Sequence, residues 1–557
     1  MEEPGFVSQK MIWGIIIVFL LIYIAPLGVR PMLTPDEFRY GEIPREMIAS
    51  GDWIVPKLNG FRYFEKPIFG YWLNAVSILI FGENAFGVRL PVAICTGLTA
   101  WLIWFMVRQI RHDEQLALLS AAVFLTSGLV FGVGTFAVLD AQVNLFITAS
   151  MVFFLKASEI RKFNTPQILW LILFGISCGL AFLTKGFLSF VVPGLAIFSY
   201  LAWQKRWREI FILPWIPLAA AILVILPWAI AVHLKEPDYW RYFIVVEHWE
   251  RFLGKNDSQH PEPFWFYIPI FLAGSLPWAL MLPAAFYLCR KKLVEIFRDR
   301  LFLFSFCSVV FPFLFFSACS GKLGTYVLPC FPGWSILTAW LLLEMLKNPN
   351  GERYCNIHNR ILAALLIVGA LGFVTFQLLA ESGFFRGVYD YSEKAIWLTA
   401  VAGGLISALF LVFSVNSKTI SQRLSWIFLF AALPLAMSML AAPGRFFEGK
   451  AQGVVLEKYT DAIPKDAIVV SHPNMVHAAC WVFKRNDIIL YGSSNEMRYG
   501  LEYPDSRHRL INDTELHKLI KNTPEGKLVF MMRGDFRERI PAAPYEIYKH
   551  NLMIARY

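Results

Sequence analysis

The stretch MIWGIIIVFLLIYIAPL, residues 11–27, decides the fold class, because it is apolar throughout and nearly long enough to cross a lipid bilayer. Its positive flank is weak and no small-residue cleavage site follows, which indicates a retained first span rather than a removed signal peptide. The whole chain of 557 residues shares this character, with 57% hydrophobic residues, 16% aromatics and a mean hydropathy of +0.52. A soluble domain cannot bury so much apolar surface, so the composition predicts a polytopic α-helical membrane protein.

Apolar runs along the chain predict about 13 transmembrane helices, since each span needs about 20 mostly apolar residues. The apolar stretch Ile68–Phe81 is too short to span and follows Pro67, which predicts an amphipathic helix lying at the membrane interface. The predicted spans are centred near Val18, Leu98, Phe124, Met151, Ile176, Leu195, Ala221, Phe271, Val310, Ile336, Leu366, Gly404 and Leu433.

The distribution of Lys and Arg predicts the topology. Alternate short loops carry several basic residues each, whereas the intervening short loops hold only Lys185, Lys322, Arg386 and Lys394. The positive-inside rule therefore places the N-terminus in the cytoplasm, and an odd number of spans places the C-terminal tail outside. The same bias explains the net charge of +10, so we expect no nucleic-acid partner.

Two predicted external loops are long, residues 30–88 and 234–263, and the composition changes after Pro443. We therefore predict a membrane-spanning domain over residues 1–442 and a small α/β domain over residues 443–557 on the outer face. Short apolar strands are expected at 467–470, 487–492, 527–533 and 546–557, with a helix at Met475–Phe483. The eight cysteines show neither metal-binding nor disulfide spacing.

The first external loop opens with TPDEFRYGE, residues 34–42. Unpaired charge is costly near lipid, so Asp36 is predicted to line a site at the water–lipid boundary. The alternative is a helix start, since Pro followed by acidic residues suits a first turn, and Glu37 is expected to serve that purpose.

The same loop continues to RYFEKP, residues 62–67, where Glu65 and Lys66 are neighbours among aromatic residues. Lys66 and Arg39 are suited to hold a lipid phosphate by charge-assisted hydrogen bonds. The alternative for Glu65 and Lys66 is a surface ion pair that contributes little.

Two short external turns hold further candidates. Asp140, in VLDAQ (138–142), is an isolated acid at a span end and is predicted to be functional, with a helix cap as the alternative. In SGKLGTY (320–326), two glycines let backbone N–H groups face an anion, Lys322 adds charge and Tyr326 can hydrogen-bond a phosphate or sugar. This turn lacks the spacing of a P-loop.

The second long loop contains VEHWERF (246–252) and then His260. His248 together with Glu65 is a candidate pair of metal ligands, but the spacing is not diagnostic, and a solvated loop histidine is the alternative. A divalent ion such as Zn²⁺ or Mg²⁺ is therefore compatible with the sequence, although nothing in it requires a cofactor.

All three candidate catalytic acids, Asp36, Glu65 and Asp140, are predicted to lie outside the cytoplasm, where ATP and nucleotide sugars are absent. An enzyme working there must take an activated substrate that is already membrane-borne, such as a sugar on a lipid phosphate. A flippase or transporter is the alternative class. It would place ionisable residues near the membrane midplane and often shows internal repeats, neither of which is visible here.

Several motifs resemble the bacterial lipid A aminoarabinose transferases, membrane glycosyltransferases of the GT-C fold class related to protein O-mannosyltransferases. The first is PDEFRYGEIPREMIASGDWIVPKLNGFRYFEKPIFGYW (35–72), and others are VLDAQ, EPDYWRYFIVVEHWERF, GKLGTYVLPCF and the C-terminal RNDIILYGSSNEMRYGLEYPD. Phe38, Gly41 and Gly324 depart from the family pattern. The resemblance otherwise extends along essentially the whole chain.

The resemblance implies an inverting transfer of 4-amino-4-deoxy-L-arabinose from undecaprenyl phosphate to a phosphate of lipid A or its precursor, at the outer face of the bacterial inner membrane. Such a product masks negative charge and confers resistance to polymyxin and cationic peptides. A related GT-C enzyme that moves another polyprenyl-phosphate sugar to a lipid or protein acceptor is the alternative within the class.

Overall fold

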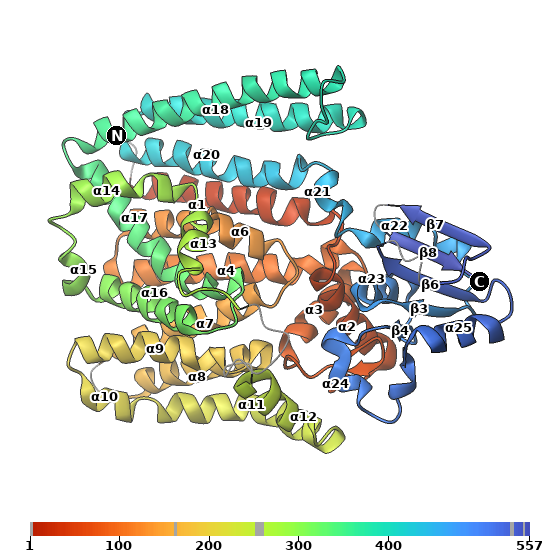
Figure 1. Ribbon diagram of the computed structural model, residues 1–557. Coiled ribbons are helices and arrows are strands. Elements are labelled where there is room, and N and C mark those ends of the chain that lie inside the picture. The colour runs from red at the N-terminus through yellow and green to blue at the C-terminus, as the bar shows by residue number, and fades with distance from the viewer. Residues whose placement is uncertain (1–3, 161–163, 251–260, 535–539, 550–551) are drawn as a thin grey trace. The chain divides into compact units, whose positions relative to one another are not determined.

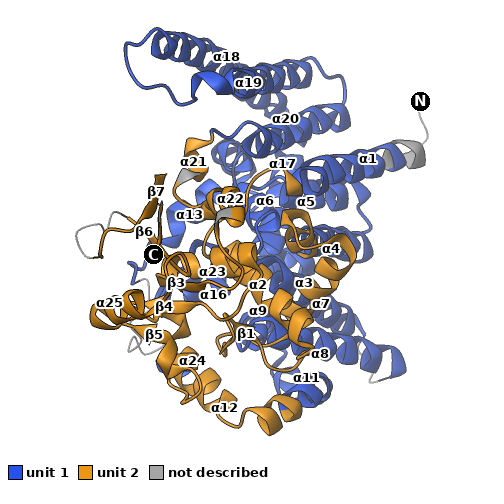
Figure 2. Ribbon diagram, turned by 90° about the vertical axis from the view of Figure 1, so that its right-hand side faces the viewer, with its two compact units in different colours: residues 1–27, 92–229, 248–443 blue, residues 28–91, 230–247, 444–557 orange. Residues whose placement is uncertain are grey.

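The computed structural model describes residues 4–160, 164–250, 261–534, 540–549 and 552–557. The chain divides into two compact units, coloured separately in Figure 2. Unit 1 comprises Met1–Leu27, Val92–Ala229 and His248–Pro443, and unit 2 comprises Gly28–Pro91, Ile230–Glu247 and Gly444–Tyr557. Unit 2 therefore combines the first predicted external loop with the C-terminal segment, rather than consisting of the C-terminal segment alone.

Unit 1 is built from apolar helices that run side by side (Figure 1). Two of its helices cross the unit boundary, since α4 begins and α11 ends in unit 2. Its α-helices are α1 (Pro4–Phe19), α4 (Ala85–Arg111), α5 (Glu114–Leu125), α6 (Gly128–Gly134), α7 (Asp140–Glu159), α8 (Thr165–Lys185), α9 (Leu188–Trp203), α10 (Trp207–Ile212), α11 (Trp215–Lys235), α13 (Tyr267–Gly274), α14 (Leu282–Cys289), α15 (Glu295–Arg298), α16 (Arg300–Ala318), α17 (Phe331–Lys347), α18 (Gly351–Glu381), α19 (Lys394–Val415) and α20 (Ile420–Leu440).

Ten of the predicted spans are present, among the described residues, as helices long and apolar enough to cross a membrane. The span predicted near Leu195 is α9, a helix of only 16 residues, and the run near Phe271 contains the eight-residue helix α13. The run near Phe124 is divided into α5 and α6, which meet at 63°. The hydroxyls of Thr126 and Ser127 bond back to helix carbonyls at this break, which is a recognised cause of bending. The total number of spans therefore stays a prediction.

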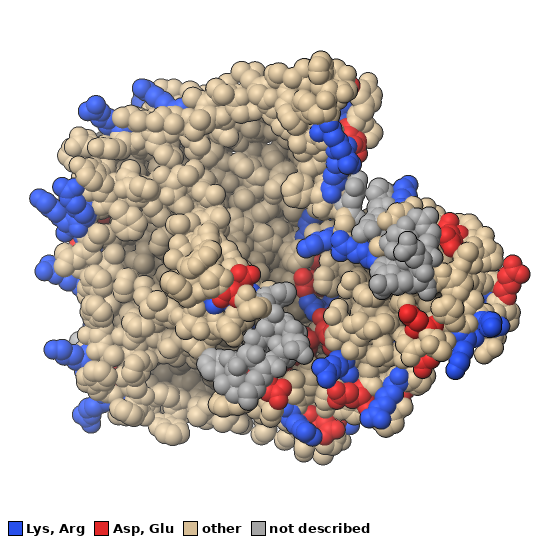
Figure 3. All heavy atoms as spheres, viewed as in Figure 1, with Lys and Arg blue, Asp and Glu red and all other residues tan. Residues whose placement is uncertain are grey.

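The surface of unit 1 fits a membrane-spanning protein. In the most apolar stretch of α18 only 11% of the residues are buried, so an apolar helix faces outward. In Figure 3 the sides of the helices carry little charge, and several Lys and Arg side chains gather at the helix ends on the left. The last turns of α4 and α17 hold such residues, namely Arg108, Arg111 and Lys347.

The predicted interfacial helix is confirmed as a helix, α3 (Phe69–Phe81), whose 13 residues are too few to span a bilayer. Its last two turns expose four large apolar side chains, Val76, Leu79, Ile80 and Phe81. A helix with one buried face and one exposed apolar face is typical of a membrane interface.

The C-terminal part of unit 2 contains a six-stranded sheet in the order β5-β4-β3-β6-β8-β7. Four strands are parallel, and β8 and β7 add an antiparallel edge. The predicted helix and the first three predicted strands are confirmed, but the run predicted as one strand over 546–557 holds two antiparallel strands, β7 and β8. The elements are β3 (Ile468–Ser471), α23 (Pro473–Phe483), β4 (Ile489–Tyr491), α24 (Arg498–Leu501), β5 (Leu510–Ile511), α25 (Asp513–Asn522), β6 (Leu528–Arg533), β7 (Tyr545–Lys549) and β8 (Leu552–Arg556).

The sheet of unit 2 has its own apolar core, which includes Val470, Phe530 and Met553, with Leu516 contributed by α25. The first-loop part of unit 2 adds α2 (Asp36–Ser50) and the strands β1 (Lys57–Leu58) and β2 (Phe61–Arg62), and α2 packs against both α3 and α23. The remaining helices of the unit are short: α12 (Tyr239–Arg241), α21 (Arg445–Glu448) and α22 (Gln452–Lys458).

Candidate active site

Helix α2 places the first two candidates. It begins at Asp36, so Asp36 and Arg39 lie one turn apart on the same side of the helix. Pro44 lies inside the helix and has no N–H, which leaves the carbonyl of Tyr40 without its usual helical donor. Asn74 of α3 supplies that donor through its Nδ2 at 3.0 Å, so the cost of the proline is offset by a contact that holds α2 on α3.

A tight hairpin places the second pair of candidates. Strands β1 and β2 are joined by Asn59 and Gly60, both in the left-handed region with φ of 54° and 74°, which matches the preference of Asn-Gly for this type of turn. Both backbone N–H groups donate to the carboxylate of Glu46 on α2, at 2.5 and 2.9 Å. The chain leaves β2 directly into Tyr63–Lys66, so the turn fixes where Glu65 and Lys66 begin.

Arg39 is the centre of the site in unit 2. Its guanidinium donates to Asp36 on its own helix, to Glu496 in the C-terminal segment and, at 3.4 Å, to the hydroxyl of Tyr63. The side chain of Asp36 is 39% exposed while that of Arg39 is 13% exposed, so Asp36 is the member of the pair that a solute can reach. The ring Nε2 of His477, on α23, donates to the other oxygen of Glu496, since a carboxylate can only accept.

Glu65 and Lys66 continue the same network. The hydroxyl of Tyr63 donates to Glu65 Oε2 at 2.8 Å, so Glu65 is connected to Arg39 through one side chain. The ammonium of Lys66 donates to the backbone carbonyl of Glu65 at 3.0 Å and pairs with Glu247. The four predicted residues of unit 2, Asp36, Arg39, Glu65 and Lys66, therefore belong to one hydrogen-bonded cluster.

The two linked carboxyls differ in their ease of ionisation. Burial, together with the charge of Glu247, raises the pKa of Glu65 to about 7. Burial would also raise the pKa of Glu496, but the charge of Arg39 and the contact with His477 outweigh it and lower that pKa to about 2. Near neutral pH the cluster thus combines one fixed carboxylate with one carboxyl that exchanges its proton readily.

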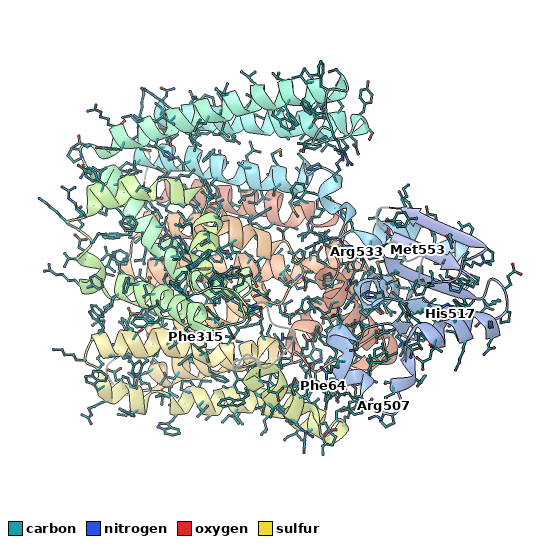
Figure 4. All side chains as sticks on the ribbon, in the orientation of Figure 1. Phe64, Phe315, Arg507, His517, Arg533 and Met553 are labelled. Atoms are coloured by element: carbon teal, nitrogen blue, oxygen red, sulfur yellow. The ribbon has the colours of Figure 1, made fainter. Side chains whose placement is uncertain are left out.

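Aromatic residues enclose the Tyr63–Lys66 segment on one side. Phe64, which Figure 4 labels, is 1% exposed and lies 5.0 Å from the ring of Tyr239 and 5.5 Å from that of Tyr499. These contacts provide about 0.5–1.5 kcal/mol per pair beyond simple burial. The segment that carries Glu65 and Lys66 is therefore anchored by its buried aromatic neighbour.

Glu37, beside Asp36 in the sequence, lies in a different environment. It is fully buried and its carboxylate accepts from Arg30 at 2.7 Å and from Arg89 at 2.7 Å. Its oxygen also accepts the backbone N–H of Leu33 at 3.0 Å. The ion pairs of Glu37 are therefore structural, and the one with Arg89 ties the start of α2 to α4.

A cavity of about 610 Å³ in unit 2 does not contain this cluster. It is lined by Phe38, Arg30 and Trp481 among others, and by none of Asp36, Arg39, Glu65 or Lys66. The structure also explains two departures from the family pattern here. Phe38 packs on Gly453, since a Cβ added at residue 453 would lie 2.4 Å from the Phe38 ring. Gly41 packs on Trp481, since a Cβ added at residue 41 would lie 3.1 Å from the Trp481 ring.

Asp140 and Tyr326 meet in unit 1. Asp140 is the first residue of α7 and pairs with Lys185 at the end of α8, at 2.7 Å. The ammonium of Lys185 lies 5.0 Å from the centre of the Tyr326 ring, a cation–π distance. All three side chains line one small cavity, together with apolar residues such as Val143 and Phe316. Asp140 is thus paired with a base rather than capping its helix.

Lys322 and His248 have other surroundings. Lys322 is 4% exposed and donates to the backbone carbonyls of Cys319 and Glu262, so one N–H closes its own turn and another ties that turn to the earlier segment at Glu262. His248 lies in unit 1 with its ring edge against Phe187, 5.0 Å between centres. His260 lies outside the described residues. Within the part of the chain that the structure describes, no group of three His, Cys, Asp or Glu side chains is placed to hold a metal ion.

Sequence reasoning missed four residues that complete these two clusters: Glu247, Glu496, His477 and Lys185. Lys185 had one signal, since it is a rare base in an otherwise bare external loop. Glu496 lies in the quoted C-terminal motif, but nothing local to it pairs it with Arg39, 457 residues earlier.

Comparison with known proteins was consistent along the chain. A family model described as dolichyl-phosphate-mannose-protein mannosyltransferase matches residues 9–243, and one described as the C-terminal domain of arabinosyl transferase ArnT matches residues 447–556. The undecaprenyl phosphate-α-4-amino-4-deoxy-L-arabinose arabinosyl transferase of Aeromonas salmonicida is 36% identical over 98% of both chains. A relative with the same description in Sodalis glossinidius is 38% identical over 94% of this chain and 92% of its own.

Solved structures agree on the fold. ArnT from Cupriavidus metallidurans bound to undecaprenyl phosphate superposes with a TM-score of 0.80 over 98% of both chains, at 20% identity. The archaeal oligosaccharyltransferase AglB from Archaeoglobus fulgidus gives 0.53 at 11% identity, over 95% of this chain and 69% of that one.

A bundle of apolar helices, a small sheet in a second unit and an acid–base cluster on segments outside the spans together define a membrane glycosyltransferase of the GT-C fold. Identity above 30% over nearly the full length then settles the family. The chain belongs to the undecaprenyl phosphate-α-4-amino-4-deoxy-L-arabinose arabinosyl transferases.

Proposed function

We propose that this protein transfers 4-amino-4-deoxy-L-arabinose from undecaprenyl phosphate to a phosphate of lipid A or its precursor, and so confers resistance to polymyxin and cationic peptides. The observation that carries the proposal is the connected cluster of Asp36, Arg39, Glu65 and Lys66 in a chain that matches these transferases end to end.

The reaction breaks the bond between the anomeric carbon and the donor phosphate oxygen and forms one to an acceptor phosphate oxygen. The leaving group is undecaprenyl phosphate, which departs with the electron pair. The acceptor phosphate is already anionic, so little general-base help is needed. The demanding step is to stabilise the departing phosphate and the positive charge that develops on the sugar.

Lys66 and Arg39 are proposed to bind the donor phosphate. Lys66 uses two of its three N–H groups on Glu65 and Glu247 among the described residues, which leaves one for a phosphate oxygen. Arg39 Nε has no acceptor within that same part of the chain. Lys322 and Tyr326 are weaker candidates for this role, since Lys322 already donates to two carbonyls.

Asp36, Glu65 and Asp140 are proposed to act on the sugar. The exposed carboxylate of Asp36 suits contact with the sugar's amino group or its developing charge, because opposite charges attract strongly where water is excluded. Glu65 lies two hydrogen bonds away from Arg39 in the same cluster. Asp140 lies in unit 1, where Lys185 keeps its carboxylate charge-paired. A divalent ion bound by Glu65 and His248 is not needed for any of these steps.

The inner membrane is the proposed location, with the N-terminus in the cytoplasm and the C-terminal segment in the periplasm. The asymmetry of basic loops supports this orientation. It also brings the cluster to the side where a lipid-linked sugar is the available activated donor.

The test is mass spectrometry of lipid A from a polymyxin-sensitive strain that lacks its own transferase but makes the donor lipid. Expression of this chain should add one or two aminopentose units, and Asp36→Asn should abolish the addition. Asp505→Asn, which removes a 61% exposed acid of unit 2 that pairs with Arg62 and not with Arg39, should not. An unchanged lipid A mass with confirmed membrane expression would reject this donor or acceptor and direct the search to other polyprenyl-phosphate sugars.

A further inference from the structure

We propose that His477, on α23 of the C-terminal segment, is a positioning residue of the active site that orients Arg39 and Asp36 through Glu496. The inference rests on the proposed role of the Asp36–Arg39 pair. It extends the reaction's requirements to a helix that carries none of the acids expected to touch substrate.

The contacts run from His477 through Glu496 and Arg39 to Asp36, with a side branch from Arg39 to Tyr63. Glu496 divides its carboxylate, with Oε2 accepting from Arg39 and Oε1 contacting His477 Nε2. Arg39 in turn donates to Asp36. His477 is 3% exposed, and its Nδ1 has no partner among the described residues, so the contact with Glu496 is its one hydrogen bond there.

The two ends of this chain differ in rigidity. His477 is inside α23, where Met475, Val476, Ala478 and Cys480 are all fully buried, so its ring is held by a packed helix. Glu496 lies on a three-residue 3-10 turn, Asn495–Met497, with no side-chain cap and with Asn495 at a φ of 47°. The short turn by itself does not fix the direction of the carboxylate, whereas a bond to a fixed ring does.

The charge of Glu496 also favours a fixed position of Arg39. Glu496 remains ionised because its pKa is lowered by Arg39 and His477, so it is a permanent acceptor for the guanidinium. An arginine held between two carboxylates has both its position and its rotamer set. Loss of the His477 contact lets Glu496 turn, and Arg39 then pairs with Asp36 in more than one geometry.

The test compares four full-length variants for transfer by the purified protein with donor and acceptor lipids. His477→Phe keeps ring volume but removes the donor, and we expect kcat to fall roughly 10- to 100-fold, with a smaller change in donor KM. His477→Gln places an amide nitrogen near the position of Nε2 and should retain most activity, whereas His477→Asn is too short and should not. His517→Gln, in the exposed part of α25, is the matched control and should behave as wild type.

A double-mutant cycle separates positioning from packing. If His477 acts through Glu496, His477→Phe adds little to the defect of Glu496→Gln, because the link is already broken. Multiplied defects would overturn the inference, as would wild-type kcat in a folded His477→Phe protein. If His477→Phe fails to fold, the contrast between Gln and Asn at this position decides the question, and equal activities of those two variants would overturn it.

Failure of the inference is distinguishable from failure of the proposed site. Wild-type transfer by Arg39→Ala would remove the role of Arg39 itself, whatever His477 does. An inactive Arg39→Ala together with a fully active His477→Phe would leave the site standing and reject only the positioning role.

Discussion

At the scale of single residues, Asp36 and Glu37 show how two adjacent acids can serve unrelated purposes. Asp36 is 39% exposed and contacts only Arg39 among the ion pairs described, whereas Glu37 is buried between Arg30 and Arg89. The helical geometry of α2 points neighbouring side chains 100° apart, so one faces solvent and the other the interior. The two acids should therefore fail in different ways when neutralised.

Neutralising Asp36, the exposed acid of the cluster, or Glu65, the acid that exchanges its proton, should stop transfer. Asp36→Asn and Glu65→Gln are each expected to lower transfer by at least about 100-fold, the usual effect of losing one group that stabilises transition-state charge. Membrane insertion and thermal stability should stay close to wild type, because neither side chain is fully buried. Lipid A mass spectrometry with a parallel melting curve provides the measurement, and wild-type transfer by both variants would reject the site.

Glu37→Gln should instead destabilise the protein. Removing this charge leaves the guanidinium groups of Arg30 and Arg89 buried without their carboxylate, which typically costs on the order of 3–5 kcal/mol. We expect a lower melting temperature and lower yield, with near-normal transfer per folded molecule. A stable but inactive Glu37→Gln protein would show that Glu37, not only Asp36, takes part in the reaction.

The sequence was sufficient to predict those site residues whose partners are close in the chain. Asp36, Arg39, Glu65 and Lys66 lie within one loop, so their residue types and spacing pointed to a common site. His477 and Glu496 could not be assigned in this way, because their contacts with Arg39 depend on the folding of two distant segments against each other. Lys185 was visible as an unusual base, but its pairing with Asp140 required the geometry of α7 and α8.

At the scale of elements, α2 depends on its neighbour α3 for a hydrogen bond that its own sequence cannot make. Asn74→Leu should cost about 1–3 kcal/mol, because the carbonyl of Tyr40 then loses the donor that Asn74 supplies. Pro44→Ala restores a helical N–H four residues after Tyr40, so it should recover part of that loss in the double variant. Chemical or thermal unfolding of the three variants measures this, and a double variant less stable than Asn74→Leu would contradict the assignment.

The face of α2 toward α23 predicts how stability depends on pH. Burial raises the pKa of Glu42 to about 8 and that of Glu46 to about 7, both from the ordinary 4.5 of a glutamate. Between pH 4.5 and pH 8 the folded protein keeps these two carboxyls protonated while the unfolded chain loses the protons. The stability that this difference contributes is therefore fully present below about pH 4.5 and is lost as the pH rises through 7 to 8. The melting temperature should therefore fall over this range, and Glu42→Gln should flatten the fall. A melting temperature that rises between pH 5 and pH 8 would contradict this prediction.

Element types were easier to predict than element limits. Long apolar runs and short β-branched runs gave most helices and strands, because burial in lipid or in a sheet requires those compositions. The division of this run into β7 and β8 was not predicted, since residues 546–557 contain no Gly or Pro that would signal a turn. The break between α5 and α6 depends on two hydroxyls bonding back to carbonyls, which composition does not reveal.

At the scale of the whole molecule, unit 2 is assembled from segments that lie at opposite ends of the chain. The side-chain amide of Asn59 in the first loop donates to the carbonyl of Ile488 at 2.8 Å and accepts the N–H of the same residue at 3.0 Å, so it bonds both backbone groups of the residue before β4. Lys484 pairs with Glu83, and Arg62 pairs with Asp505. The expected boundary after Pro443 therefore separates two segments that fold as one unit, a relation that no local pattern in either segment predicts.

This interdependence leads to the prediction for the truncated chain. Ending the protein after Pro443 removes Glu496 and His477 and leaves Asn59 without the backbone of Ile488, so the turn that places Tyr63–Lys66 loses its partner. We expect no transfer to lipid A and faster proteolysis within residues 52–66, with the helices of unit 1 still inserted. The full-length Asp505→Asn protein controls for loss of a single link and should remain active. A fully active truncation would mean that the first loop organises the site unaided, and the roles of Glu496 and His477 would then be lost together.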